Sequence, residues 1–165
     1  MAGMSAPVRT ATASNRTTRE RSVASCTMFR HGKAPMEIIG SGIDATDISR
    51  IAAAIERYGD RFVLRVFTEG EIAYCRRKRD FASSFAARFA AKEAAMKALG
   101  TGHSRGVFWR GIEVFRHGGP PQLRFHGGAA RRCAALGATS SLLTITHSRK
   151  LAIAQVLLVK GTVEG

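Results

Sequence analysis

FASSFAARFAAKEAAMKAL, residues 81–99, is the stretch of the sequence that decides the fold class. It contains neither proline nor glycine and is rich in alanine, the residue with the highest helix propensity. The apolar residues Phe81, Phe85, Phe89, Met96 and Leu99 fall on one stripe at about 100° per residue. Gly100-Thr101-Gly102 follows directly, which is typical of a helix end. We therefore expect one long helix whose apolar stripe packs against the rest of the chain.

Two charged residues of this helix lie at or beside the apolar stripe. Lys92 falls within it, and Glu93 lies at its shoulder, four residues before Lys97. A carboxylate at that position is partly desolvated, which is costly unless a cation or hydrogen bonds compensate. Residues four apart on a helix are neighbours, so a solvated Glu93–Lys97 pair explains the pattern equally well. The helix alone leaves a functional carboxylate and an ordinary surface pair open.

The segments on either side of the helix predict a mixed fold. Upstream, we expect an isoleucine-rich strand over residues 36–43 and a helix from Ile48 to a stop at Gly59. Residues 62–67 suit a strand or a helix, and Thr68 and Glu71 have the spacing of a capping box. Downstream, we expect strands over residues 107–115 and 122–125, a short helix over 129–136, and a hairpin of strands over 142–146 and 151–159. This order indicates the α+β class.

Composition limits the possible partners. The chain has 165 residues, with 26 Lys and Arg against 12 Asp and Glu and a formal net charge of +14. The length favours one domain, and the charge favours an anionic partner: nucleic acid, a phosphorylated ligand, an acidic protein or a membrane surface. No apolar run is long enough for a transmembrane helix. Cys26, Cys75 and Cys133 form no disulfide framework or zinc motif, which favours the reducing cytosol.

Residues 1–35 differ from the rest of the chain. They are rich in Ser, Thr and Ala, lack hydrophobic periodicity, and carry several bases but one acid, Glu20. Such a segment cannot offset its ordering entropy by burial, so we predict a basic disordered leader before a domain over residues 36–165. A transit peptide and an upstream start codon ahead of Met36 both explain the leader, and we favour the second.

The segment Gly40-x-Gly42-x-x-Ala45 matches the Gly/Ala form of the dinucleotide-binding fingerprint. Asp44 would repel a pyrophosphate there, and the downstream chain lacks the strand–helix alternation that a doubly wound sheet requires. We therefore reject a dinucleotide fold. Asp44 is then a carboxylate at the end of a strand, where it could serve a functional site. Capping of the following helix by Asp44 would also explain its position.

A small set of polar residues could support phosphoryl transfer. His147 ends the strand over residues 142–146, although a lone histidine is more often structural than catalytic. No HxxxH or similar pattern indicates zinc. Asp44 and Glu93 are hard oxygen ligands that suit Mg²⁺, which takes one or two carboxylates together with phosphate oxygens and water. Bases beside such an ion suit phosphoryl transfer, because positioning and charge neutralisation do most of that catalysis.

Three motifs, in this order, carry a resemblance to a known family. They are Gly42-Ile43-Asp44, then Arg88-Phe-Ala-Ala-Lys92-Glu93-Ala with Lys97 and Gly100-Thr101-Gly102, and Ile145-Thr146-His147-Ser148 followed by Leu-Ala-Ile-Ala-Gln. Over residues 36–159 the chain resembles holo-[acyl-carrier-protein] synthase, the small bacterial class of 4'-phosphopantetheinyl transferases. One departure is Gly119-Pro120-Pro121, where the family commonly has Gly-Lys-Pro, so a phosphate or partner contact by that lysine is missing here.

The resemblance implies a fold, a reaction and a set of site residues. The fold would be an antiparallel sheet packed on the long helix. The reaction would be Mg²⁺-dependent transfer of 4'-phosphopantetheine from coenzyme A to a serine of apo acyl carrier protein, releasing adenosine 3',5'-bisphosphate, in fatty acid and lipid biosynthesis. Asp44 and Glu93 match the metal ligands, and Lys97 would neutralise charge on the phosphate oxygens. The residues that match coenzyme A phosphate contacts are Arg88, Lys97, Gly100, Gly102 and His147.

Two roles stay open within this resemblance. His147 would be either a phosphate contact or a participant in deprotonating the serine, and a metal-bound water held by Glu93 would be an equally good base. Lys92 is a weaker candidate for a phosphate contact and would otherwise be structural.

The resemblance also implies partners. These are an acidic acyl carrier protein and further copies of the chain in a homotrimer with active sites between subunits; we expect neither a membrane nor a nucleic acid. Arg50, Arg57 and Arg61 lie where the family docks the carrier, although a solvated basic face would be the ordinary explanation. Two rival functions are a phosphopantetheinyl transferase for polyketide or peptide synthase carriers and a basic nucleic-acid-binding domain. The first predicts a duplicated chain and the second predicts aromatic residues interleaved with bases, and the sequence has neither.

Overall fold

The computed structural model describes residues 36–161, and the predicted leader over residues 1–35 lies outside the described residues. No helix in this described part is long and apolar enough to cross a membrane. The elements are β1 Glu37–Asp47, α1 Ile48–Tyr58, α2 Asp60–Val66, α3 Glu69–Arg76, α4 Phe81–Ala98, the 3₁₀ turn η1 Trp109–Gly111, β2 Ile112–Phe115, β3 Gln122–Phe125, α5 Gly127–Ala135, β4 Ser140–His147 and β5 Leu151–Lys160.

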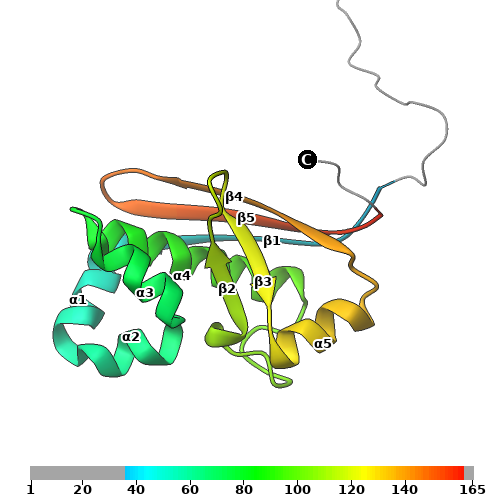
Figure 1. The fold of residues 1–165 in the computed structure, drawn as a ribbon, viewed down its shortest axis with the longest axis horizontal. Coiled ribbons are helices and arrows are strands. Elements are labelled where there is room, and N and C mark those ends of the chain that lie inside the picture. Colours follow the sequence, from blue (N-terminus) through cyan, green and yellow to red (C-terminus); the bar gives the residue numbers. More distant parts are fainter. Residues whose placement is uncertain (1–35, 162–165) are drawn as a thin grey trace, which may run out of the picture. The chain divides into compact units, whose positions relative to one another are not determined.

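A three-stranded antiparallel sheet in the order β1-β5-β4 packs against the long helix α4. Figure 1 shows the three long strands running together with the helices on one side of them. Strand β5 is central, with Ala154 opposite Asp44 of β1 and opposite Ile145 of β4. Strands β2 and β3 form a separate two-stranded hairpin. The α+β class and the sheet packed on a central helix are thus confirmed.

Strand β1 lies in direct backbone contact with α4. A Cβ atom built on Gly42 would lie 2.0 Å from the carbonyl oxygen of Ala94, and one on Gly40 would lie 2.4 Å from that of Ala98. These two glycines are therefore required by close approach. The expected end of this strand at residue 43 was wrong: β1 continues to Asp47, and Asp44 lies within the strand.

Helix α4 confirms the predicted long helix but is buried more evenly than a single stripe predicts. Its alanines are buried on several sides, because β1, β5, α1, α3 and β2 all pack around it. Phe85 is 2 % exposed, whereas Phe81, which we placed on the same stripe, is 47 % exposed. Small side chains allow this close packing on every side, which an apolar periodicity does not record.

The other elements follow the prediction with local differences. The open segment over residues 62–67 lies in α2, and the Thr68–Glu71 capping box at the start of α3 is confirmed. The strand expected over residues 107–115 is instead the turn η1 followed by the short strand β2. Helix α5 begins two residues earlier than expected, and β4 and β5 form the predicted antiparallel hairpin.

The outer face of the sheet, opposite α4, has no helix upon it among the described elements. Alternate residues of the three strands point to this face, and apart from Asp47, which lies opposite Leu151, the residues named below are apolar or uncharged polar. Ile43 is 60 % exposed there, and Leu142 and Leu151 are each 37 % exposed. The outward residues are Ser41, Ile43, Ala45, Leu142, Thr144, Thr146, Leu151, Ile153, Gln155 and Leu157. An apolar sheet face of this kind is typical of an interaction surface.

Candidate active site

Asp44 of β1 forms an ion pair with Lys97 near the end of α4. The Lys97 ammonium lies 2.8 Å from Oδ1 of Asp44 and donates to the carbonyl oxygen of Ile43 at 2.9 Å. Thr46 donates to Oδ2 of Asp44 at 2.8 Å. The Asp44 side chain is 16 % exposed and that of Lys97 is 53 % exposed. Because Lys97 is half exposed, solvent screens this ion pair, and it adds little to stability.

Glu93 lies on α4 one turn before Lys97. Strand β1 runs antiparallel to α4, since Gly40 lies against Ala98 and Gly42 against Ala94. Two further residues along the strand correspond to about one turn of the helix, which places Asp44 level with the turn that contains Glu93. Lys97 is one turn later on the same helix and reaches back to Asp44, because helical side chains tilt toward the N-terminus. Asp44 and Lys97 are in contact, and the backbone register brings the turn of Glu93 near them; we call Asp44, Glu93 and Lys97 the carboxylate cluster.

The carboxylate cluster has a donor set that fits a hard cation. In the described part of the chain, no group of three or more His, Cys, Asp or Glu side chains could hold a metal ion by itself. Two carboxylates without such a cage are the donor set expected for Mg²⁺, whose other positions are filled by phosphate oxygens and water. The geometry therefore fits an ion that is bound together with a phosphorylated substrate.

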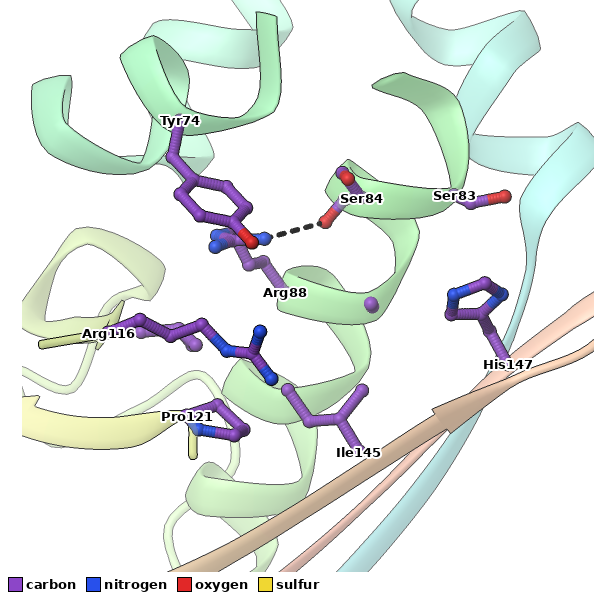
Figure 2. A pocket seen from close by; sticks show the side chains of 10 residues that line it. Tyr74, Ser83, Ser84, Arg88, Arg116, Pro121, Ile145 and His147 are labelled. Carbon is purple, nitrogen blue, oxygen red and sulfur yellow. Dashed lines mark hydrogen bonds between the residues drawn. The ribbon is translucent and has the colours of Figure 1, made fainter. Parts of the chain in front are cut away.

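A second site lies elsewhere on α4, in a pocket of about 230 Å³. Arg88, Arg116 and His147 lie around it, with Ser83 and Ser84 at one edge (Figure 2). Arg116 comes from the loop that follows β2, and His147 is the last residue of β4. The lining residues include no carboxylate. We call this the arginine pocket.

Arg88 is the unusual residue of the arginine pocket. It is 6 % exposed, and its Nε has no hydrogen-bond partner among the residues that the structure describes. One guanidinium N–H donates to the carbonyl oxygen of Ser84 at 3.3 Å, and the group lies 4.0 Å from the centre of the Tyr74 ring. A buried guanidinium without an acidic partner is costly, and a bound anion would remove that cost.

The positive charge of this region also affects Tyr74. Partial burial opposes ionisation of its hydroxyl, but Lys78, Arg88 and the nearby Arg116 together lower the pKa of Tyr74 below its ordinary value. Guanidinium and ammonium groups that stabilise a phenolate would stabilise a phosphate in the same way. The arginine pocket therefore has the electrostatics of a phosphate site.

The structure divides the predicted phosphate-contact residues between two places. Arg88 and Lys97 are nine residues apart on α4, which places them on opposite faces and about 14 Å apart along the helix axis. His147 lies with Arg88, whereas Gly100 and Gly102 follow Lys97 in the loop after the helix. Both glycines have positive φ, 67° and 55°, so they shape the turn that ends α4. Within one chain the predicted residues therefore form two separate sites.

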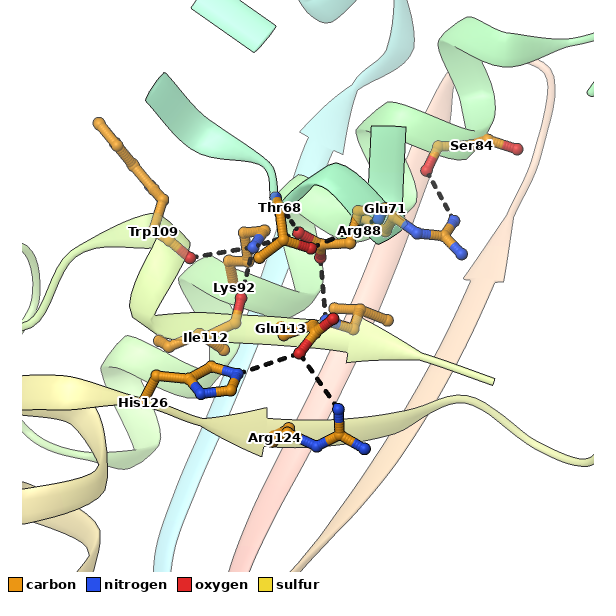
Figure 3. Close-up of polar contacts among 11 residues, drawn as sticks. Thr68, Glu71, Ser84, Arg88, Lys92, Trp109, Ile112, Glu113, Arg124 and His126 are labelled. Carbon is orange, nitrogen blue, oxygen red and sulfur yellow. Dashed lines mark hydrogen bonds and ion pairs between the residues drawn. The ribbon is translucent and has the colours of Figure 1, made fainter. Parts of the chain in front are cut away.

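Lys92 is buried and fully paired. Its ammonium lies 2.8 Å from Oε2 of Glu71, and both side chains are 0 % exposed. It also donates to the carbonyl oxygens of Trp109 and Ile112, as Figure 3 shows. Burial lowers the pKa of Lys92, although the Glu71 carboxylate opposes this effect. Of the two roles left open for Lys92, the contacts support the structural one.

The predicted docking arginines lie on two neighbouring helices. Arg50 and Arg57 are exposed on α1, and Arg61 is exposed on α2. Arg57 lies over the ring of Tyr58 at 5.2 Å from its centre. Arg65 adds a further exposed base on α2, so the four arginines extend over both helices.

Comparison with known proteins assigns the chain to a family. The family model of the 4'-phosphopantetheinyl transferase superfamily matches residues 40–155. The chain belongs to this superfamily. A holo-[acyl-carrier-protein] synthase of Koribacter versatilis is 49 % identical over 122 residues, which cover 73 % of this chain and 98 % of that relative. The matched range contains both the carboxylate cluster and the arginine pocket.

Solved structures of the superfamily have the same fold. The holo-[acyl-carrier-protein] synthase of Neisseria meningitidis is 27 % identical, with a TM-score of 0.69 over 74 % of this chain and 98 % of that one. The Helicobacter pylori enzyme, solved in complex with coenzyme A, is 29 % identical, with a TM-score of 0.63 over 73 % of this chain and 99 % of that one.

Two site residues of this 4'-phosphopantetheinyl transferase were missed by sequence reasoning. Arg116 was not singled out because it lies in a loop without a motif, and only the fold brings it to Arg88. Trp109 donates its indole N–H to Glu93, and no motif in the sequence singles it out. Its position 16 residues after Glu93 gives no sequence signal for this contact.

Proposed function

We propose that this protein transfers 4'-phosphopantetheine from coenzyme A to a serine of apo acyl carrier protein and releases adenosine 3',5'-bisphosphate. The reaction belongs to fatty acid and lipid biosynthesis. The observation that carries the proposal is the carboxylate cluster, Asp44, Glu93 and Lys97, within the matched family range. The 49 % identical relative named holo-[acyl-carrier-protein] synthase and the Helicobacter pylori structure with coenzyme A support the same substrates.

The carboxylate cluster would act on the pyrophosphate of coenzyme A. Asp44 and Glu93 would hold Mg²⁺, which supplies charge neutralisation at the phosphate oxygens. The serine hydroxyl would give its proton to a water held by Glu93. The serine oxygen forms a new bond to the phosphorus next to pantetheine, and the bond from that phosphorus to the oxygen of the leaving adenosine 3',5'-bisphosphate breaks. Lys97, 2.8 Å from Asp44, would neutralise the charge that grows on the phosphate oxygens during this exchange.

The arginine pocket would bind another phosphate group of the same coenzyme A. Arg88 is buried and has no acidic partner among residues 36–161, and Arg116 and His147 line the same cavity. His147 therefore shares a pocket with two guanidinium groups rather than with a reacting centre on the same chain. We assign it to a phosphate contact instead of serine deprotonation.

The two sites would be joined in a homotrimer. Lys97 and Arg88 lie on opposite faces of α4, so one coenzyme A molecule can use both more readily if they come from different copies. The apolar outer face of the sheet, with Ile43 60 % exposed, supports such an assembly. Closed rotational symmetry would give three equivalent sites between subunits.

The carrier would dock on the arginines of α1 and α2. Acyl carrier proteins are acidic, and Arg50, Arg57 and Arg61 are exposed there. Opposite charges would mainly accelerate encounter and set orientation. The variant Arg57→Glu should therefore raise the KM for carrier and leave the KM for coenzyme A unchanged; an unchanged carrier KM would exclude this docking face.

We also place the protein in the reducing cytosol, since Cys75 and Cys133 are free thiols.

A direct assay tests the proposed function. The full chain is incubated with coenzyme A, Mg²⁺ and an apo acyl carrier protein, and the carrier is weighed by mass spectrometry. We expect a gain of one phosphopantetheinyl group on the wild-type carrier and no gain on a carrier whose acceptor serine is replaced by alanine. A wild-type carrier of unchanged mass would refute the function.

A further inference from the structure

Two consecutive residues of α4, Lys92 and Glu93, bind the main-chain carbonyl group and the indole side chain of Trp109. The Lys92 ammonium donates to the main-chain carbonyl oxygen of Trp109 at 2.9 Å. The indole N–H of Trp109 donates in turn to Oε1 of Glu93. The main chain and the side chain of Trp109 are therefore both fixed to the helix that carries a residue of the carboxylate cluster.

The main-chain contact is rigid because the Lys92–Glu71 pair is fully satisfied. An ammonium group has three N–H donors, and Lys92 directs them to Glu71, Trp109 and Ile112. Glu71 also accepts from the backbone N–H groups of Thr68 and Val114, at 2.8 and 2.9 Å. These contacts, drawn in Figure 3, connect α3, α4, η1 and β2. The turn η1 is thus held in place on α4.

The indole ring is held by neighbouring aromatic rings. The ring of His103 lies 4.2 Å from the Trp109 ring, centre to centre, with 39° between the planes. The ring of Phe89 lies 6.0 Å away, with 34° between the planes. Packed rings at these distances attract one another beyond simple burial. The indole N–H therefore has a fixed direction, and that direction is toward Glu93.

This arrangement determines what the Glu93 carboxylate can do. An indole nitrogen is a donor only, so it cannot itself bind a cation, but it can fix the orientation of a carboxylate that does. It occupies Oε1, and Oε2 has no hydrogen-bond partner among the described residues. Oε1 of Glu93 is therefore oriented by the indole, and Oε2 is available to a cation. Carboxylates that bind metal ions in proteins are commonly oriented in this way by a hydrogen bond from a neighbouring residue.

We propose that Trp109 is the positioning residue for Glu93 and that its indole N–H orients this carboxylate for a divalent cation. The proposal rests on the role of Glu93 in the proposed function. Because the chain contains one tryptophan, the fluorescence of Trp109 also becomes a direct report of ion binding at Glu93.

The first test compares the affinity of the full chain for Mn²⁺ by calorimetry. Trp109→Phe removes the N–H and keeps an aromatic ring against Phe89 and His103. We expect about 10- to 100-fold weaker Mn²⁺ binding, the usual effect of losing an outer-sphere hydrogen bond. Phe108→Leu is the matched control, since Phe108 is adjacent in sequence and 57 % exposed, and its Mn²⁺ affinity should equal that of the wild type. A merely structural Trp109 would lower the melting temperature without changing Mn²⁺ affinity, and that result would overturn the proposal.

The second test needs no variant at position 109. Paramagnetic Mn²⁺ should quench the emission of wild-type Trp109 saturably, and Mg²⁺ should reverse the quenching by competition. Glu93→Ala should abolish the saturable part. Absence of saturable quenching in the wild type would overturn the proposal. If Glu93→Ala loses Mn²⁺ affinity and Trp109→Phe does not, the positioning role fails while the ion site stands. If neither variant loses affinity, Glu93 is not an ion ligand and both assignments fail, whereas the carrier mass still tests the transfer separately.

Discussion

At the scale of single residues, the Asp44–Lys97 pair is more important for chemistry than for stability. Lys97 is 53 % exposed, so solvent screens its attraction to Asp44 and the pair adds little to folding. We predict that Lys97→Ala changes the free energy of unfolding by less than about 1 kcal/mol. The same variant should reduce the transfer rate by about 100- to 1,000-fold, because it removes a charge aimed at the phosphate oxygens.

Urea unfolding and the rate of carrier modification check the two halves of this prediction. Lys160→Ala is a suitable comparison, because Lys160 is also an exposed lysine and lies at the end of β5, outside both the carboxylate cluster and the arginine pocket. A Lys97→Ala enzyme that keeps the wild-type rate would remove Lys97 from the mechanism.

Gly42 is the residue at which β1 and α4 approach most closely. Because a Cβ atom there would lie 2.0 Å from the Ala94 carbonyl oxygen, the strand must move away from the helix to accommodate alanine. We predict that Gly42→Ala lowers the free energy of unfolding by at least about 1 to 3 kcal/mol, the usual range for overpacking. Gly119→Ala is the matched control, since nothing lies within 4 Å of a Cβ built there. Equal urea midpoints for the two variants would contradict the close contact.

The sequence predicted that the charged side chain of Lys92 lies at the apolar side of α4, but it did not predict which residue pairs with it. Lys92 was placed on the apolar stripe, and a charge there requires a partner. That partner is Glu71, 21 residues earlier, and sequence analysis had assigned Glu71 only to a capping box. Both roles are real, since Glu71 also accepts from the N–H of Thr68. A local motif revealed the local contact, and only the fold revealed the distant one.

At the scale of elements, the buried Glu71–Lys92 pair connects α3 to α4. Because both side chains are 0 % exposed, removing one charge leaves the other buried without compensation. We predict that Lys92→Met lowers the free energy of unfolding by about 3 to 5 kcal/mol. The double variant Lys92→Met with Glu71→Gln should be more stable than Lys92→Met alone, because no isolated carboxylate remains. Urea unfolding of the four proteins of this cycle measures the coupling, and additive effects would contradict it.

The start of α4 makes its stability depend on pH. Asp80 caps the helix by accepting from the N–H of Ser83 at 3.0 Å and from the Ser83 hydroxyl. These hydrogen bonds, with a smaller contribution from His147, lower the pKa of Asp80 below its ordinary value of 3.8. A carboxylate with a lowered pKa stabilises the fold above its ordinary pKa, and this contribution is lost as the pH falls through the lowered pKa.

It follows that Asp80→Ala should cost about 1 kcal/mol at pH 7, the typical effect of losing an N-cap. The difference between variant and wild type should shrink as the pH falls below about 4. Urea unfolding of both proteins at pH 7 and at pH 3 measures this difference. A difference that does not change with pH would show that the charge of Asp80 contributes nothing.

Element types were predicted better than element limits. The long helix, the capping box and the final hairpin each have a local signal in propensity, side-chain spacing or turn residues. Strand β1 was predicted to end at residue 43, but it continues to Asp47 because residues 44–47 pair with β5, a distant contact that no local pattern records. The turn η1 was included in a predicted strand, whereas Lys92 holds the carbonyl oxygen of Trp109 there, a contact that no local pattern encodes.

At the scale of the whole molecule, the separation of the two sites on α4 is the main result. The nine-residue spacing of Arg88 and Lys97 places them on opposite faces of a helix. Sequence analysis nevertheless assigned both to one set of phosphate contacts, because both side chains are basic. A coenzyme A molecule that uses both sites is most simply bound between two copies of the chain. The apolar outer face of the sheet provides a surface on which such copies can associate.

This arrangement predicts complementation between inactive variants. Lys97→Ala would disable one half of every shared site and Arg88→Gln the other half, so each protein alone should be inactive. In trimers assembled from an equal mixture, about one quarter of the interfaces should pair an intact Lys97 with an intact Arg88. Co-expression should therefore restore about a quarter of the wild-type transfer rate. A mixture of Lys97→Ala and Asp44→Ala is the control: these residues share one cluster on one chain, so no interface regains both. Absence of recovery in the first mixture would place the whole site within a single chain, and equal recovery in both mixtures would show that Asp44 and Lys97 do not act from the same chain.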